Sequence, residues 1–133
     1  MNIKITHKIS LDRVADLLCN ALEGGSNYWY MIEKCKAPTF TWWGAHNDAK
    51  VKYSHLYPFQ KGGSLTISDE VAHDNLKADK RVKRLTLSSL RRGLKLMAIS
   101  HADHFADFMA EEDDGNTADV FLQLALFGEV IYG

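Results

Sequence analysis

The chain has 133 residues, of which 46% are hydrophobic and 25% are charged, and its formal net charge is -1. This length and composition are typical of one globular domain and exclude a chain that is disordered throughout. The near-neutral charge argues against a protein that coats duplex DNA, and no apolar run reaches the about 18 residues that a membrane-spanning helix needs. We therefore expect a single domain over residues 1–133 with neither duplex nucleic acid nor a membrane as its partner.

The two cysteines, Cys19 and Cys35, form no CxxC pair and have no histidines at zinc-ligand spacing around them. The first residues, MNIKITHK, lack the charged and then apolar regions of a secretory signal. These features predict a protein of a reducing cytoplasm.

Near the N-terminus, the spacing of apolar residues changes from that of a strand to that of a helix. Apolar and polar side chains alternate over residues 3–9, which predicts a half-buried strand. Ser10 then stands at the N-cap position of a helix over residues 11–23, because apolar residues follow it at helical spacing up to a Gly–Gly pair.

A long aromatic region follows, in which three tryptophans and four of the five tyrosines lie between positions 28 and 57. We expect a short helix over residues 28–34 and no regular element from there to residue 63. Aromatic side chains supply contact area to cores and to binding pockets equally well.

The second half of the chain predicts two strands and three helices. Residues 64–68 and 83–87 alternate as short strands, and a helix capped by Ser88 follows over residues 88–100, with Gly93 as an unfavourable interior residue. Helices are also expected over residues 101–110 and 117–127, the last capped by Asn116 or Thr117 and apolar nearly all round, so that it should run through the middle of the protein. The fold class is therefore α+β: a small antiparallel sheet, from strands near 3–9, 64–68, 83–87 and the further candidate 129–132, packs against three to four helices (11–23, 88–100, 101–110, 117–127).

Two end segments carry a resemblance. The first is ALEGGSNYW over residues 21–29, and the second runs from Ala118–Asp119 through QLALFGE, residues 123–129, to Tyr132–Gly133. Together with the strand–helix passage near residues 85–95, they resemble a family of small proteins encoded by bacteriophages and prophages. The resemblance implies the cytoplasm of a bacterial host as the setting and assigns no role to any residue.

The charge is strongly divided along the chain. Eight of the 16 basic residues lie between Lys77 and Lys95 against one acid, and seven acids with no base lie between Asp103 and Asp119. Two solvated faces would explain this pattern, but a phosphate-bearing ligand or a host protein would also match it. Under the ligand hypothesis aromatic rings would stack on a nucleotide-type signal and arginines would hold its phosphate. The candidates are Tyr28, Trp29, Trp42, Trp43, Arg81, Arg84, Arg91 and Arg92, with Asp119 and Gln123 as polar partners.

Enzymatic alternatives have weaker support in the sequence. His101 and His104 lie three residues apart and would suit a metal-assisted hydrolase if further ligands converged on them. Glu23 and Asp119 would form a paired-carboxylate site only if the fold brought them together. The leading hypothesis is a non-enzymatic binding protein with no cofactor, which acts on a host component in an anti-defence role. An inhibitor that docks through the acidic residues 111–114 and a homo-oligomeric assembly protein remain open as alternatives.

Overall fold

The structure is a computed structural model, and it describes residues 1–38, 53–69 and 81–133. Its elements follow one another along the chain as α1 (Leu11–Asn20), a π-helical turn η1 (Ala21–Gly25), β1 (Tyr30–Lys36), a 3-10 helix η2 (Ser54–Phe59), β2 (Ser64–Asp69), β3 (Val82–Leu85), α2 (Leu87–Ser100), α3 (Ala102–Met109) and α4 (Gly115–Phe127).

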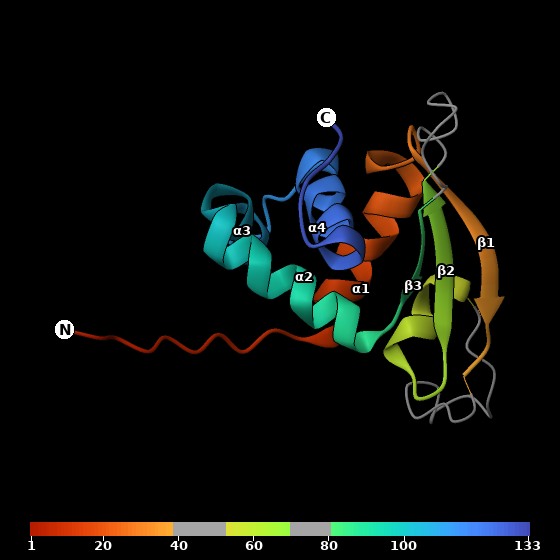
Figure 1. The fold of residues 1–133 in the computed structure, drawn as a ribbon. Coiled ribbons are helices and arrows are strands. Elements are labelled where there is room, and N and C mark those ends of the chain that lie inside the picture. Colours follow the sequence, from red (N-terminus) through yellow and green to blue (C-terminus); the bar gives the residue numbers. More distant parts are fainter. Residues whose placement is uncertain (39–52, 70–80) are drawn as a thin grey trace.

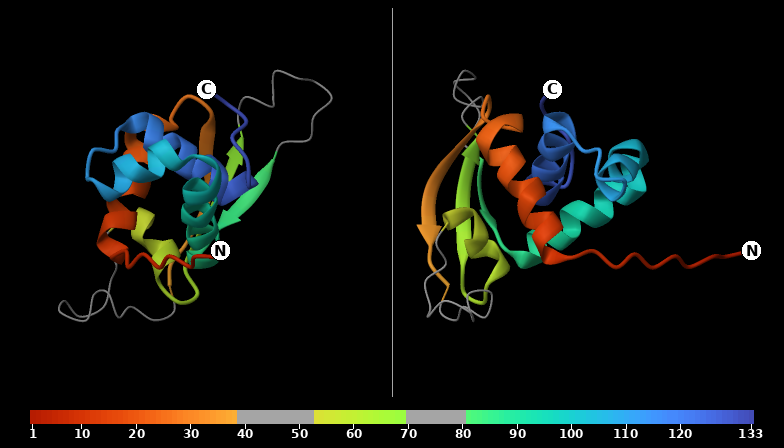
Figure 2. Two further views of the ribbon diagram at one scale, coloured as in Figure 1. Left: turned by 90° about the vertical axis from the view of Figure 1, so that its left-hand side faces the viewer. Right: turned by 180° about the vertical axis from the view of Figure 1, so that it is seen from behind.

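The protein is an α+β fold of two layers, as predicted. The three described strands are antiparallel in the order β1-β2-β3, with Ile32 opposite Ile67 in the first pair and Leu65 opposite Leu85 in the second. The helices cover one side of this sheet, and α3 lies farthest from it (Figure 1; Figure 2). None of the described helices is long and apolar enough to cross a membrane.

Helix α4 runs through the core, as its apolar sequence predicts. Nine of its residues are buried, and it contacts α1, α2, α3, η1 and β3. Its packing against α2 is close, since a Cβ added to Gly93 would lie 2.8 Å from the Cβ of Ala125. Gly93 is therefore required for helix packing, which outweighs the cost of a glycine inside a helix.

The helix ends follow the predicted chemistry, although two caps are displaced by a few residues. The Ser10 hydroxyl accepts a hydrogen bond from the backbone N–H of Arg13, as expected. Helix α2 is capped by Thr86 rather than Ser88, and α4 by Asp114 rather than Asn116 or Thr117. Gly128 ends α4 with φ 76°, a left-handed conformation that glycine adopts without strain.

The strand predicted over residues 3–9 is wrong. These residues form an extended arm that leaves the body of the protein before α1 (Figure 1), and Ile3 and Ile5 are 75% and 73% exposed. An alternating pattern shows that one side of a segment can be buried, but it does not say which surface buries it.

Three further expectations differ from the structure, the first being that no regular element forms before residue 63, where the 3-10 helix η2 lies. Residues 28–34 are not helical, because β1 pairs there with β2 and its aromatic and β-branched residues suit a strand. Residues 129–132 form no strand, although Val130 and Tyr132 pack against the core.

Candidate functional site

The two end segments meet in space at the carboxylate of Asp119. One of its oxygens accepts hydrogen bonds from the Ser26 hydroxyl and the indole N–H of Trp29, each at 2.7 Å, and the other accepts the Tyr28 hydroxyl at 2.5 Å. Ser26, Trp29 and Asp119 are all buried. Nearby, a Cβ on Gly25 would lie 2.3 Å from the carbonyl oxygen of Gly115, so a glycine allows η1 and the start of α4 to approach this closely. We call these contacts the Asp119 network.

Gln123, one turn after Asp119, ties the C-terminal segment to the same helix. Its side-chain oxygen accepts the backbone N–H groups of Ile131 and Tyr132, and its side-chain nitrogen donates to the carbonyl oxygen of Tyr132. The Tyr132 hydroxyl in turn donates to Asp69 at the end of β2. The segment that was predicted as an edge strand is therefore held by a buried side chain instead of by a strand ladder.

Of the two aromatic candidates in this region, Trp29 belongs to the core, whereas Tyr28 is half-exposed. Trp29 is fully buried, and its ring stacks on Tyr132 with centroids 5.8 Å apart and contacts Phe127 at 5.4 Å. Burial, followed by the hydrogen bond to Asp119, raises the pKa of Tyr28 to about 12. Burial and the hydrogen bond to Asp69 raise the pKa of Tyr132 to about 12 as well. Both phenols are thus held neutral as donors to carboxylates.

Two of the four candidate arginines have structural partners. Arg81 lies 3.7 Å from the buried carboxylate of Asp69, and its guanidinium lies over the ring of Phe127. Arg92 donates to the carbonyl oxygens of Ala125 and Leu126 in the last turn of α4. A cation at the C-terminal end of a helix is favourable there, so these arginines stabilise the fold.

The other two arginines, Arg84 and Arg91, line one cavity together with Lys36 and Lys61. The cavity has a volume of about 520 Å³ and lies among η2, the ends of all three strands and the start of α2. No acidic residue is among the described residues that line it. Within the described ranges Lys36, Arg84 and Arg91 also form no ion pair, so no acid neutralises their charges there. We call this site the cationic pocket.

The rest of the lining suits an anion with an apolar part. Hydroxyl groups of Ser64, Thr86 and Ser88 are present, and the pocket reaches the N-terminal end of α2, where the helix dipole favours negative charge. Leu11 and Leu87, both half-buried, supply an apolar wall. Volumes of this order are typical of pockets for small molecules.

Local conformation brings Lys61 to the pocket. A Cβ on Gly63 would lie 2.1 Å from the carbonyl oxygen of Tyr57, so the Lys61–Gly62–Gly63 turn folds tightly back on η2. Gly62 has φ 82°, which also favours glycine. Lys36 comes from the end of β1, where it lies opposite Ser64 of β2 in the sheet. Sequence reasoning missed both lysines, since the only local signal was a lysine directly before a Gly–Gly pair.

Several sequence candidates are not brought to this pocket. Tyr28, Trp29, Asp119 and Gln123 lie together in the Asp119 network and its neighbouring contacts, and Trp42 and Trp43 lie outside the described residues. Glu23 is exposed, whereas the oxygens of Asp119 are bonded to three donors, so the paired-carboxylate hypothesis has no geometric support.

Among the described residues, no further side chains join His101 and His104 to form a set of metal ligands. The ring centroids of His101 and His104 are 6.5 Å apart, and Nδ1 of His104 lies 2.8 Å from the Thr117 hydroxyl. Over residues 1–38, 53–69 and 81–133, no group of three or more His, Cys, Asp or Glu side chains is arranged to hold a metal ion.

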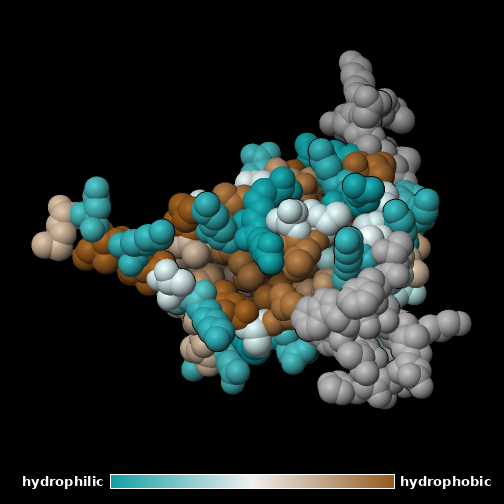
Figure 3. Space-filling model, turned by 90° about the horizontal axis from the view of Figure 1, so that it is seen from below, coloured by the Kyte–Doolittle hydropathy of each residue, from teal (hydrophilic) through white to brown (hydrophobic). Residues whose placement is uncertain are grey.

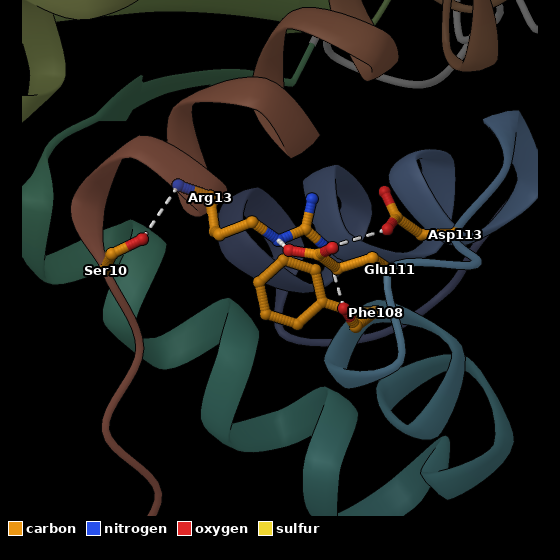
Figure 4. A network of polar contacts seen from close by, with 5 residues as sticks. All are labelled: Ser10, Arg13, Phe108, Glu111 and Asp113. Carbon is orange, nitrogen blue, oxygen red and sulfur yellow. Dashed lines mark hydrogen bonds and ion pairs between the residues drawn. The ribbon is translucent and has the colours of Figure 1, made fainter.

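Two acids of the segment 111–114, Glu111 and Asp113, lie against the guanidinium of Arg13 (Figure 4). Asp113 forms an ion pair with Arg13 at 2.9 Å, and Glu111 lies 3.7 Å from the same guanidinium. Asp114 caps α4 through the backbone N–H of Thr117, which lowers the pKa of that carboxyl. Three of the four acids thus have partners within the protein, which leaves less charge for docking a partner.

Comparison with known proteins yields no match among family models, curated proteins or solved structures.

Proposed function

We propose that the protein is a non-enzymatic binding protein that captures a small phosphate-bearing ligand of the nucleotide type in the cationic pocket. The observation that carries this proposal is the convergence of Lys36, Lys61, Arg84 and Arg91 on one cavity whose described lining contains no carboxylate.

The chemistry of the lining favours a phosphate ester over a simple carboxylate. Lys36, Arg84 and Arg91, which form no ion pair within the described ranges, repel one another unless an anion of several charges screens them, and a di- or oligophosphate carries such a charge. The hydroxyls and the start of α2 add hydrogen-bond donors for phosphate oxygens. The apolar wall of Leu11 and Leu87 gives the organic part of the ligand a surface to contact.

The phage resemblance suggests how such capture would be used. A phage-encoded protein that removes a nucleotide signal of its bacterial host would act against host defence without any catalytic step. Trp42 and Trp43 stay candidates for stacking on the base, since they lie between two segments that line the pocket along the chain.

Calorimetric titration tests the proposal with inorganic phosphate, mononucleotides, linear dinucleotides and cyclic dinucleotides. We expect at least one nucleotide to bind more tightly than inorganic phosphate. Arg84→Gln and Arg91→Gln should each weaken that binding about tenfold or more, which corresponds to about 1.4 kcal/mol. Binding should also weaken as salt is added, because exposed charges are screened.

Matched controls are available on the same elements. Lys83→Gln changes the neighbouring residue of β3, and Lys95→Gln changes an exposed residue one turn after Arg91; neither lines the pocket. Both variants should bind as the unaltered protein does. Absence of binding across the whole panel, or equal losses in the control and pocket variants, would contradict the proposal.

A further inference from the structure

The N-terminal arm (residues 1–9) exposes one apolar side to water. Met1 is fully exposed, Ile3 and Ile5 are about three-quarters exposed, and the contacts of the arm with its own body lie near its base, where His7 meets Phe105 edge-on at 5.3 Å and Ile9 packs against the core. Burying an isoleucine side chain contributes about 1.5–3 kcal/mol, so a second surface that covered this side would be substantially stabilising.

A groove of about 260 Å³ lies at the base of the arm. Its apolar lining comes from Ile9, Phe108 and Met109, and Arg13 and Glu111 stand at its polar side. The guanidinium of Arg13 lies 4.8 Å from the centroid of the Phe108 ring and donates to the Phe108 carbonyl oxygen, so this wall is held in place (Figure 4). Apolar residues occur both along the arm and on the underside beside its base (Figure 3).

The arm and the groove are complementary under a two-fold axis. Odd-numbered residues form the apolar side of the arm, and in an antiparallel pair of identical strands centred on one residue, odd positions face odd positions. The tip of one arm would then lie beside the base of the other, where the groove opens. The backbone N–H and C=O groups of each arm would then bond to the other arm instead of to water.

We propose that two copies of this chain exchange their N-terminal arms as an antiparallel pair, so that Met1 and Ile3 of each copy fill the groove of the other. A second copy is the partner, because each chain carries both the apolar arm and the groove, side by side. In a dimer, each arm is therefore covered and each groove is filled, and the contact is closed and symmetric. This inference is independent of the cationic pocket, whose lining does not include the arm.

The charges of Lys4 and Lys8 favour one of two central registers of the pair. If the two-fold axis passed through Thr6, Lys4 of each copy would lie opposite Lys8 of the other, and like charges directly opposite are destabilising. If the axis passes through Ile5, Lys4 lies opposite Thr6 and Lys8 opposite Asn2, while Ile3 lies opposite His7. The pairing of Ile5 with Ile5 is therefore the expected register.

Sedimentation equilibrium of the full chain over a range of concentrations tests the exchange. We expect a reversible dimer whose dissociation constant rises tenfold or more in Ile3→Asp and in Ile5→Asp. Their secondary structure and melting temperature as monomers should stay unchanged, because both side chains are exposed in the single chain. Val82→Asp, which alters a half-exposed residue of β3, should dimerise like the unaltered protein. A chain that stays monomeric at every concentration, or a dimer insensitive to both arm variants, overturns the proposal.

Single cysteines test the register in a chain that carries Cys19→Ser and Cys35→Ser. Under oxidised glutathione, Ile5→Cys should give a covalent dimer that a reducing agent separates, whereas Thr6→Cys should give much less. Faster cross-linking of Thr6→Cys would overturn the register. Absence of cross-linking in both variants would overturn arm pairing itself.

Discussion

The Asp119 network and the cationic pocket both gather polar side chains from distant parts of the chain, but they differ in how those groups are satisfied. In the network a buried carboxylate accepts three hydrogen bonds, and every donor comes from the segment 26–29. In the pocket Lys36, Arg84 and Arg91, which form no ion pair within the described ranges, line a cavity whose described lining contains no acid. A buried polar group with all its partners stabilises a fold, whereas converging charges of one sign weaken it and are suited to a ligand.

The largest effect should come from breaking the network at its centre. Asp119→Ala leaves the Ser26 hydroxyl and the Trp29 indole N–H buried without an acceptor, and each such group costs about 1–3 kcal/mol. We expect the free energy of unfolding to fall by about 3–5 kcal/mol, measured by urea denaturation. Asp107→Ala, which removes an exposed acid of α3, should change it by less than about 0.5 kcal/mol. Similar losses in the two variants would contradict a stabilising role of the Asp119 network.

An intermediate effect is expected from pH, through the two phenols bonded to carboxylates. Their pKa in the folded protein, about 12, lies above the value of 10.0 expected in the unfolded chain. The unfolded chain therefore loses these protons first, and the stability they contribute is complete below pH 10 and is lost as the pH rises toward 12. Tyr28 is half-exposed, so solvent screening makes its share smaller.

Denaturation at a series of alkaline pH values measures this effect. The slope between pH 10 and 12 should become shallower in Tyr28→Phe with Tyr132→Phe than in the unaltered protein. Each substitution should also cost about 1 kcal/mol at neutral pH, since a hydrogen bond to a buried carboxylate is lost. Tyr53→Phe, at another half-exposed tyrosine, is the matched control. An unchanged slope in the double variant would contradict the assignment.

The smallest effect on stability should come from the pocket. Arg84→Gln combined with Arg91→Gln removes two exposed charges that repel their neighbours, so the free energy of unfolding should stay within about 0.5 kcal/mol of the unaltered value or rise slightly. In contrast, adding a bound nucleotide should raise the melting temperature of the unaltered protein only. A marked loss of stability in this double variant would mean that the arginines are structural, as Arg81 and Arg92 are.

Local patterns predicted most of the helices and two of the strands correctly. The apolar stripe after Ser10 and the capped, apolar segment ending at Gly128 are signals of sequence neighbours, so α1 and α4 could be located without tertiary information. The strands near residues 64–68 and 83–87 were also found, and they correspond to β2 and β3. β1 was missed because its residues carry no clear alternation, and only its pairing with β2 makes it a strand.

The site was predicted only in part, for a related reason. Arg84 and Arg91 were candidates because of the basic cluster, but nothing local separated them from Arg81 and Arg92. Lys36 and Lys61 lie far from that cluster in sequence and were not candidates at all. The end motifs were recognised as a pair, yet their role as one hydrogen-bonded network depends on contacts across about 90 residues.

The sequence by itself determined the class of the fold, the position of its central helix and the supply of basic and aromatic side chains. The tertiary structure decided which of those side chains became core and which face a cavity. The reason is that periodicity and capping act over a few residues, whereas the burial of Trp29 and the convergence of Lys36 with Arg91 depend on how distant elements pack.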